Sequence, residues 1–216
     1  MATLLERGKK RKPIKKPTKE PAWDIALLYP LQGHWTEYDY LSLEASVGNK
    51  MIELADGYLE ILPMPDMFHQ DIVQFLLFGL DDFVVAHCVG EVSHAPLPVR
   101  LGKNRYREPD IAFFKPHRIK DKHTPPEGAD LVMEVVSPGI AARNRDLVGK
   151  RADYASAKIA EYWIVDPETK TITVLTLSGK IYKVYGVYKA GDQAASKLLK
   201  GFKVAVSEVF AAGEGK

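Results

Sequence analysis

The chain has 216 residues, of which 46% are hydrophobic and 27% are charged. These values suit a soluble globular protein with one domain and a tail, or at most two small domains. The single cysteine, Cys88, excludes an internal disulfide framework and fits a reducing compartment. No apolar stretch approaches the roughly 20 residues that span a bilayer, and no apolar segment follows the basic N-terminus. We therefore expect a cytoplasmic protein with no membrane partner.

The formal net charge of +2 is distributed unevenly along the chain. Residues 1–20 hold eight basic and two acidic residues, a charge of +6, which leaves −4 for the remainder. The Lys-rich, proline-containing composition of residues 1–22 predicts a disordered basic tail, and we expect residues 23–216 to form a single domain. Such a tail either keeps the protein in solution or acts as an arm that holds nucleic acid.

Helix and strand signals alternate in the first half of the chain. Thr36 or a close neighbour is typical of the cap of a short helix that follows. Asp56-Gly57 is a strong hairpin signal between two short strands, and apolar residues recurring every three to four positions predict a long amphipathic helix. The predicted elements are strands at 50–54 and 58–62, a helix over 68–87, strands near 91 and at 97–101, 105–107 and 110–114, and a loop over 115–127.

The second half of the chain is organised around one short apolar run, residues 130–136, which is typical of a strand buried on both faces of a sheet. Ser137-Pro138-Gly139 ends this strand and leads into a helix. The later elements are a helix over 142–156, strands at 161–165, 171–177, 181–188 and 202–206, and a helical turn at 207–211.

Two carboxylates are set into apolar strands, where a charge is costly. Asp110 begins one such strand, and Glu134 lies in the middle of another. An ionised carboxylate in this setting must be paired or bound to a metal. Lys150 lies on the helix that follows the Glu134 strand, with Asp146 four residues before it and Tyr154 four residues after it. At this spacing the three side chains share one helix face.

This set of residues indicates a particular kind of chemistry. Carboxylates crowded on one sheet repel each other, and a divalent cation is the usual way to keep them ionised. Carboxylate oxygens and waters form the hard site that Mg²⁺ prefers. A lysine beside such a metal stabilises charge on a transferring phosphoryl group or orients the attacking water. The pattern therefore favours metal-assisted hydrolysis of a phosphodiester.

The sequence around these residues resembles the PD-(D/E)XK nuclease signature, with Pro109-Asp110 followed by Glu134-Val135-Val136. Val136 stands where that signature has its lysine. The longer pattern is similar to the Uma-two family, whose members are assigned as restriction endonucleases and whose lysine has migrated to the next helix. The resemblance covers roughly residues 36 to 210, most of the chain. The matching pieces are 53–57, His69-Gln70, 109–111, 131–138, Asp146, Lys150, Tyr154 and 161–167.

The resemblance implies an α/β (α+β) fold of the restriction-endonuclease type, with a central mixed β-sheet flanked by helices. An N-terminal β-hairpin and C-terminal strands would be added to it. It also implies Mg²⁺, with Mn²⁺ as an alternative, a DNA substrate and often a homodimer. Asp110, Glu134 and Glu53 would hold metal and Lys150 would act in catalysis, with His69, Tyr154 and Asp146 in support. Two features depart from the family pattern: Ala55, where a larger apolar residue is expected, and the Lys-rich tail.

Each of these residues also has a purely structural interpretation. Glu134 could be the buried salt-bridge partner of Lys150, since buried acids are usually paired. Asp110 could be a turn residue after Pro109, and Glu53 a solvated residue of a hairpin. His69 could serve only at a helix start, and Tyr154 could be mainly a core residue with its hydroxyl near the site.

Two other functions are compatible with the sequence. A non-catalytic nucleic-acid-binding or regulatory dimer would keep the fold but would have no reason to retain the acidic set with Lys150. A hydrolase of small phosphoesters would keep the metal chemistry without cleaving DNA. Cleavage of plasmid DNA with Mg²⁺ or Mn²⁺, and its loss with a chelator, separates the nuclease from both.

Overall fold

A six-stranded sheet forms the centre of the computed structural model, which describes residues 32–47 and 52–215. The predicted basic tail, residues 1–22, lies outside the described residues. Neighbouring strands β7 and β8 run parallel and the other neighbours run antiparallel, so the central sheet is mixed, as predicted. The strands are, in spatial order, β10 (Ile181–Tyr188), β9 (Thr171–Ser178), β8 (Glu161–Asp166), β7 (Leu131–Val135), β6 (Ile111–Phe114) and β3 (Glu91–His94).

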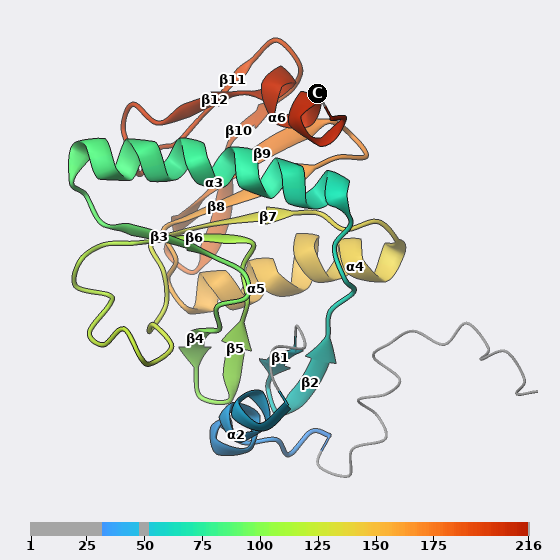
Figure 1. Cartoon of the computed structure of the whole chain (residues 1–216), viewed down its shortest axis with the longest axis vertical. Coiled ribbons are helices and arrows are strands. Elements are labelled where there is room, and N and C mark those ends of the chain that lie inside the picture. Colours follow the sequence, from blue (N-terminus) through green and yellow to red (C-terminus); the bar gives the residue numbers. More distant parts are fainter. Residues whose placement is uncertain (1–31, 48–51, 216) are drawn as a thin grey trace, which may run out of the picture.

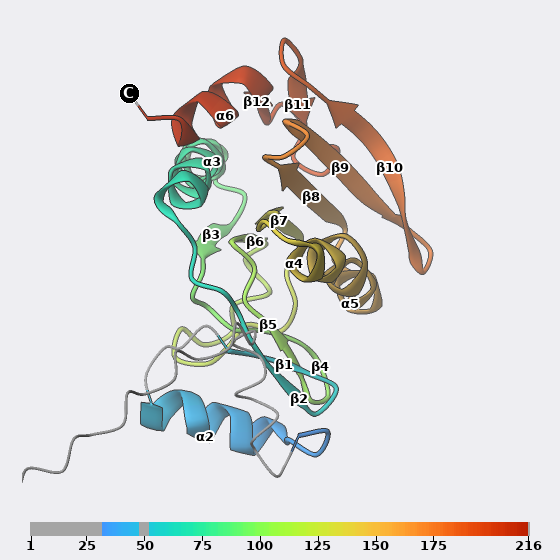
Figure 2. The ribbon, with the colours of Figure 1, turned by 90° about the vertical axis from the view of Figure 1, so that its right-hand side faces the viewer.

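Helices cover both faces of this sheet (Figures 1 and 2). One face packs against the long amphipathic helix α3 (Met67–His87) and the C-terminal helix α6 (Val206–Gly213), and the other against α4 (Ile140–Asn144) and α5 (Lys150–Ser156). Strand alternation divides the side chains of β7 between the two cores. Met133 and Val135 join the α3 core, whereas Val132 joins the core on the α5 side, the side to which Glu134 also points.

A second, four-stranded sheet lies beside α5, away from α3 (Figure 2). The predicted Asp-Gly hairpin is present in it, and the strands predicted at 97–101 and 105–107 extend this hairpin into a sheet of its own. Helix α2 (Glu37–Val47) packs on the second sheet, where the ring of Tyr40 lies 5.2 Å from that of Tyr106. The predicted cap is confirmed, because Thr36 and Asp39 exchange hydrogen bonds. The strands are β2 (Tyr58–Ile61), β1 (Ile52–Ala55), β5 (Arg105–Arg107) and β4 (Val99–Gly102).

The helix predicted over 142–156 begins earlier, at Ile140, and contains a π-helical turn, η1 (Arg145–Gly149), between α4 and α5. The Lys150 N–H donates to the carbonyl of Arg145, five residues back. A π-turn of this kind adds one residue to the helix without breaking it, so apolar spacing alone does not reveal it. The turn lies directly before the lysine of the candidate site.

Beyond the central sheet, the C-terminal strand β12 (Lys203–Ala205) pairs with β11 (Gln193–Ala195) in a separate two-stranded sheet. The buried carboxylate of Glu161 holds the segment between them. It accepts hydrogen bonds from Trp163 Nε1 (2.7 Å), Ser196 Oγ (2.6 Å) and the N–H groups of Lys197 and Leu198 (both 2.8 Å). None of the helices in the described part of the chain is long and apolar enough to cross a membrane.

We predict that Glu161→Gln destabilises the fold by about 3 kcal/mol, because the amide NH2 would replace one carboxylate oxygen and face two of the four donors. For a domain of this size this is a fall of roughly 6–12 °C in melting temperature. Thermal melts would measure it, with the exposed Glu208→Gln as a control that should melt like the wild type. Equal melting of Glu161→Gln and wild type would contradict this role.

Candidate active site

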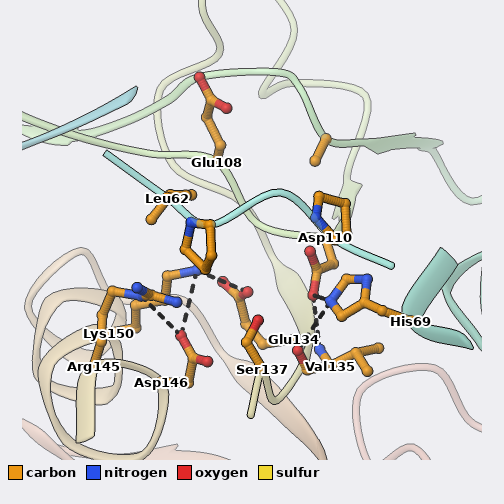
Figure 3. Close-up of a pocket in the computed structure, with 13 residues that line it drawn as sticks. Leu62, His69, Glu108, Asp110, Glu134, Val135, Ser137, Arg145, Asp146 and Lys150 are labelled. Carbon is orange, nitrogen blue, oxygen red and sulfur yellow. Dashed lines mark hydrogen bonds and ion pairs between the residues drawn. The ribbon is translucent and has the colours of Figure 1, made fainter. Parts of the chain in front are cut away.

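Asp110 and Glu134 lie opposite each other on neighbouring strands. Strands β6 and β7 are antiparallel with Ile111 facing Met133, and one further step of this register places Asp110 across from Glu134. The backbone N–H of Val135 donates to Asp110 Oδ2 at 2.7 Å and so holds the carboxylate against β7. Both acids line the same pocket (Figure 3).

This pocket, which we name the acidic pocket, lies between the π-turn and the ends of the interior strands β6 and β7. It encloses about 30 Å³, room for about one or two water molecules or an ion. Six of the thirteen residues of its wall carry charged side chains (Figure 3). Its lining residues are Leu62, Pro63, Pro65, His69, Ala95, Glu108, Asp110, Glu134, Val135, Ser137, Arg145, Asp146 and Lys150.

Lys150 is the cation at the back of the acidic pocket, and its side chain is only 4% exposed. Its Nζ lies 2.8 Å from Glu134 Oε2, 3.6 Å from Glu53 Oε1 and 3.7 Å from Asp146 Oδ1. Tyr154 OH donates to the other oxygen of Glu134. The side chains of Asp146, Lys150 and Tyr154, predicted to share a helix face, therefore meet around Glu134 and Glu53. In this structure Glu134 is also the salt-bridge partner of Lys150, so the structural interpretation and the site interpretation describe the same contact.

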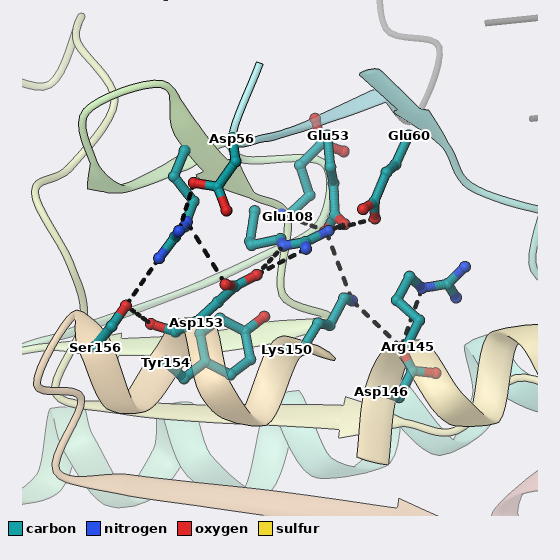
Figure 4. Close-up of polar contacts among 12 residues, drawn as sticks. Glu53, Asp56, Glu60, Glu108, Arg145, Asp146, Lys150, Asp153, Tyr154 and Ser156 are labelled. Carbon is teal, nitrogen blue, oxygen red and sulfur yellow. Dashed lines mark hydrogen bonds and ion pairs between the residues drawn. The ribbon is translucent and has the colours of Figure 1, made fainter. Parts of the chain in front are cut away.

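Glu53 reaches the site from the second sheet and is fully buried (Figure 4). Its carboxylate accepts from Arg107 Nη1 at 2.7 Å and from the N–H of Glu108 at 2.9 Å, which excludes a solvated hairpin residue. Glu53 is not among the residues that line the acidic pocket, and it contacts the site through Lys150. Arg107 in turn bonds to Asp153 of α5 and to Glu60 of β2, so this one guanidinium ties the second sheet to the helix.

His69 comes from the first turn of α3, where Asp66 caps the helix by accepting from the His69 N–H. The His69 Nε2 lies 3.3 Å from Asp110 Oδ2 and 3.1 Å from the carbonyl oxygen of Val135. Burial lowers the pKa of His69. The hydrogen bond and the charge of Asp110 raise it, with smaller contributions from Val135 and Glu134, and the net pKa lies above its ordinary value. His69 is thus placed to orient Asp110 as well as to start the helix.

The two buried glutamates have opposite pKa shifts. Burial raises the pKa of Glu134. Lys150 lowers it and the nearby carboxylates of Asp110, Asp146 and Glu53 raise it, and the net pKa is about 8. Burial also raises the pKa of Glu53, but Lys150 and Arg107 more than reverse this, and its pKa lies below its ordinary value. Glu134 is therefore the carboxyl group that takes up a proton most readily. For Lys150, burial lowers the pKa, and the three carboxylates around its ammonium raise it above its ordinary value.

Two basic residues of this region do not follow from the sequence pattern. Arg107 alternates with Arg105 along β5, a spacing that places both on one face, but its three carboxylate partners come from distant segments. Arg145 is the first residue of the π-turn and lines the acidic pocket. No pattern in the sequence marks that turn.

The donor atoms fit a hard divalent cation. Within the described residues, no three or more His, Cys, Asp or Glu side chains are grouped so that they could hold a metal ion by themselves. Mg²⁺, however, is usually bound by one or two carboxylates with several waters. Asp110 and Glu134 supply two carboxylates on one wall of the acidic pocket, and Val135 adds backbone oxygen beside them.

The sequence matches the model of a known protein family over most of its length. The profile of the Uma2 family, described as "Putative restriction endonuclease", matches residues 35–207. The chain belongs to the Uma2 family. No curated protein matches the sequence. The resemblance inferred from the motifs is thereby confirmed, and the match includes Glu53, Asp110, Glu134 and Lys150.

The fold of this Uma2 protein also resembles that of a solved structure. The crystal structure of "a putative nuclease belonging to DUF820" from Anabaena variabilis ATCC 29413 superposes with a TM-score of 0.68. The sequences are 16% identical, and the similarity covers 82% of this chain and 98% of that chain. The likeness confirms the predicted architecture, a mixed central sheet flanked by helices.

The pKa of Glu134 gives a pH-dependent prediction. A carboxyl group with a raised pKa contributes stability that is present below its unfolded value of 4.5 and is lost as the pH rises through about 8. In chelator, the melting temperature of the wild type relative to Glu134→Gln should therefore fall between about pH 5 and pH 9.

Glu53→Gln is the matched control, because the pKa of Glu53 is lowered. Its contribution is present above its unfolded pKa, so Glu53→Gln should be destabilised by a constant amount over the same range. A difference between wild type and Glu134→Gln that stays constant or grows with pH would show that Glu134 is held as a simple salt bridge.

Proposed function

We propose that this Uma2 protein is an endonuclease that hydrolyses DNA phosphodiester bonds with Mg²⁺, or with Mn²⁺ as an alternative ion. The observation that carries the proposal is the convergence of Asp110, Glu134 and Lys150 on one acidic pocket. Two opposed carboxylates with a buried lysine beside them suit the hydrolysis of a phosphoester. Membership of a family described as restriction endonucleases supports the choice of nucleic acid as substrate.

Asp110 and Glu134 would hold the metal, and Glu53 would support the site through Lys150. When bound, the ion supplies a Lewis acid and lowers the pKa of a coordinated water. The chain keeps the two carboxylates in place by different means. The Val135 N–H and His69 orient Asp110, whereas Tyr154 and Lys150 hold the two oxygens of Glu134.

Lys150 has two roles in this proposal. Without a cation its ammonium donates to Glu134 Oε2 at 2.8 Å. With a cation held by Asp110 and Glu134, the ammonium would be free to stabilise charge on the phosphoryl group or to orient water. Asp146 and Glu53, 3.7 and 3.6 Å from Nζ, keep the ammonium at the pocket wall in either state.

The family resemblance also leads us to expect a homodimer. A dimer would let two acidic pockets cut the two strands of a duplex. Sedimentation of the purified full chain tests this expectation, and a monomer at working concentration would remove it without affecting the chemistry of the single site.

The nuclease activity is tested with supercoiled plasmid DNA. We predict nicking with Mg²⁺ or Mn²⁺ and none with chelator. Lys150→Met, which keeps the length and removes the charge, should lower the cleavage rate on the order of 10²- to 10³-fold. Folded Lys150→Met should still bind metal, because the ammonium no longer competes for Glu134, and thermal melts show whether a loss of cleavage follows from a loss of fold.

Lys183→Met, an exposed lysine of β10, is the matched control and should cleave like the wild type. Wild-type protein that binds DNA but nicks none with either ion would favour the non-catalytic binding protein. Turnover of a chromogenic phosphodiester without plasmid cleavage would favour the small-phosphoester hydrolase.

A further inference from the structure

The π-turn brings a second cation to the acidic pocket. In a regular α-helix, residues five apart lie about 140° apart around the axis and cannot share a face. Here the Lys150 N–H bonds to the Arg145 carbonyl, so Arg145 lies one helical turn before Lys150 on the same side. Both side chains line the acidic pocket as a result (Figure 3). A π-turn at this place is thus a means of aiming Arg145.

Arg145 is held more loosely than the other cations of the region. Its described ion pair is a single contact, from Nε to Asp146 Oδ1 at 3.3 Å, and its side chain is 20% exposed. Lys150 meets three carboxylates, and Arg107 also bonds to three while remaining 4% exposed. Arg145 therefore combines access to the pocket with a guanidinium that is not fully engaged.

Binding of a phosphodiester at this negatively charged pocket requires a positively charged side chain that is free to contact it. Four carboxylate side chains line this small cavity, and a phosphodiester is an anion that they repel; they belong to Glu108, Asp110, Glu134 and Asp146. Lys150 is largely committed to these carboxylates. A guanidinium presents a planar fork of donors that matches two oxygens of a phosphate, and it stays charged when partly buried.

We propose that Arg145 binds the substrate by donating to the non-bridging oxygens of the phosphodiester at the acidic pocket. This inference rests on the proposed nuclease function and adds to it a substrate contact outside the acidic set and Lys150. Asp146 pairs with both Lys150 and Arg145. In the free protein it holds the guanidinium at the pocket, and on substrate binding the phosphate replaces it as the partner of Arg145.

The test compares Arg145→Ala and Arg145→Lys with Arg151→Ala. Arg151 lies on the same helix but lines a separate groove, and it also makes a single described polar contact, to the Tyr182 carbonyl. Binding of a fluorescein-labelled 20-base-pair duplex by the full chain is followed by anisotropy in Ca²⁺ over a series of KCl concentrations. Cleavage of supercoiled plasmid is followed in Mg²⁺ and Mn²⁺.

Arg145→Ala should weaken duplex binding on the order of tenfold at low salt and reduce the slope of log K against log [KCl] by about one. It should slow plasmid cleavage at subsaturating DNA by at least the same factor. Arg145→Lys should recover the salt slope but only part of the cleavage, since the charge returns without the fork. Arg151→Ala should behave as the wild type in both assays.

A double variant separates the substrate contact from mere neutralisation of Asp146. If Arg145 acts only by balancing that carboxylate, Asp146→Asn should restore duplex binding to Arg145→Ala. A direct phosphate contact predicts that Arg145→Ala weakens binding by the same factor in the Asp146→Asn background as in the wild type. Thermal melts of each variant show whether a loss of binding follows from a loss of fold.

The outcomes distinguish this inference from the proposed function. Wild type that binds and cleaves while Arg145→Ala matches it in affinity, salt slope and rate overturns the role of Arg145 and leaves the nuclease intact. Wild type that binds without cleaving, with the slope reduced in Arg145→Ala, overturns the nuclease and keeps the phosphate contact. Wild type that neither binds nor cleaves overturns both.

Discussion

The buried ammonium of Lys150 is the point on which the arrangement of this protein depends. Its three carboxylate neighbours come from three different elements: Glu134 from the central sheet, Glu53 from the second sheet and Asp146 from the π-turn. Removing a charged group of this kind from water is costly unless all its partners are in place. The same contacts that stabilise the lysine therefore fix the relative positions of the two sheets and the helix between them.

The two glutamates that contact Lys150, Glu53 and Glu134, lie in different electrostatic environments. Arg107 pairs with Glu53, and its further partners are Asp153 and Glu60. Lys150 and Arg107 together lower the pKa of Glu53 despite its burial, so this carboxylate stays ionised. Burial and the other acids of the acidic pocket raise the pKa of Glu134, although Lys150 lies beside it. Glu134 is thus a carboxyl group of the pocket that takes up a proton more readily than an exposed glutamate does. Carboxylates with this property are typical of functional sites.

Much of this was predictable from the sequence, and the limits have physical causes. The Asp110 and Glu134 strands carry strong local signals, because buried strands are continuous apolar runs in which a carboxylate is conspicuous. The face shared by Lys150 and Tyr154 follows from helical spacing. The separate second sheet does not, since strand signals say nothing about which partners pair. The role of Arg107 could not be predicted for the same reason, because its partners lie 46, 47 and 54 residues away in the chain. Arg145 escapes because a π-turn changes the helix phase without altering the composition.

The most direct test of the account is a crystal structure of the protein with Mn²⁺, read in anomalous difference maps. The account predicts one strong peak between the carboxylates of Asp110 and Glu134, with the Lys150 ammonium no longer bonded to Glu134 Oε2 and still near Asp146 and Glu53. A map without a peak in the acidic pocket at saturating Mn²⁺, with Lys150 still paired to Glu134, would contradict it. The cluster would then be a structural ion-pair network.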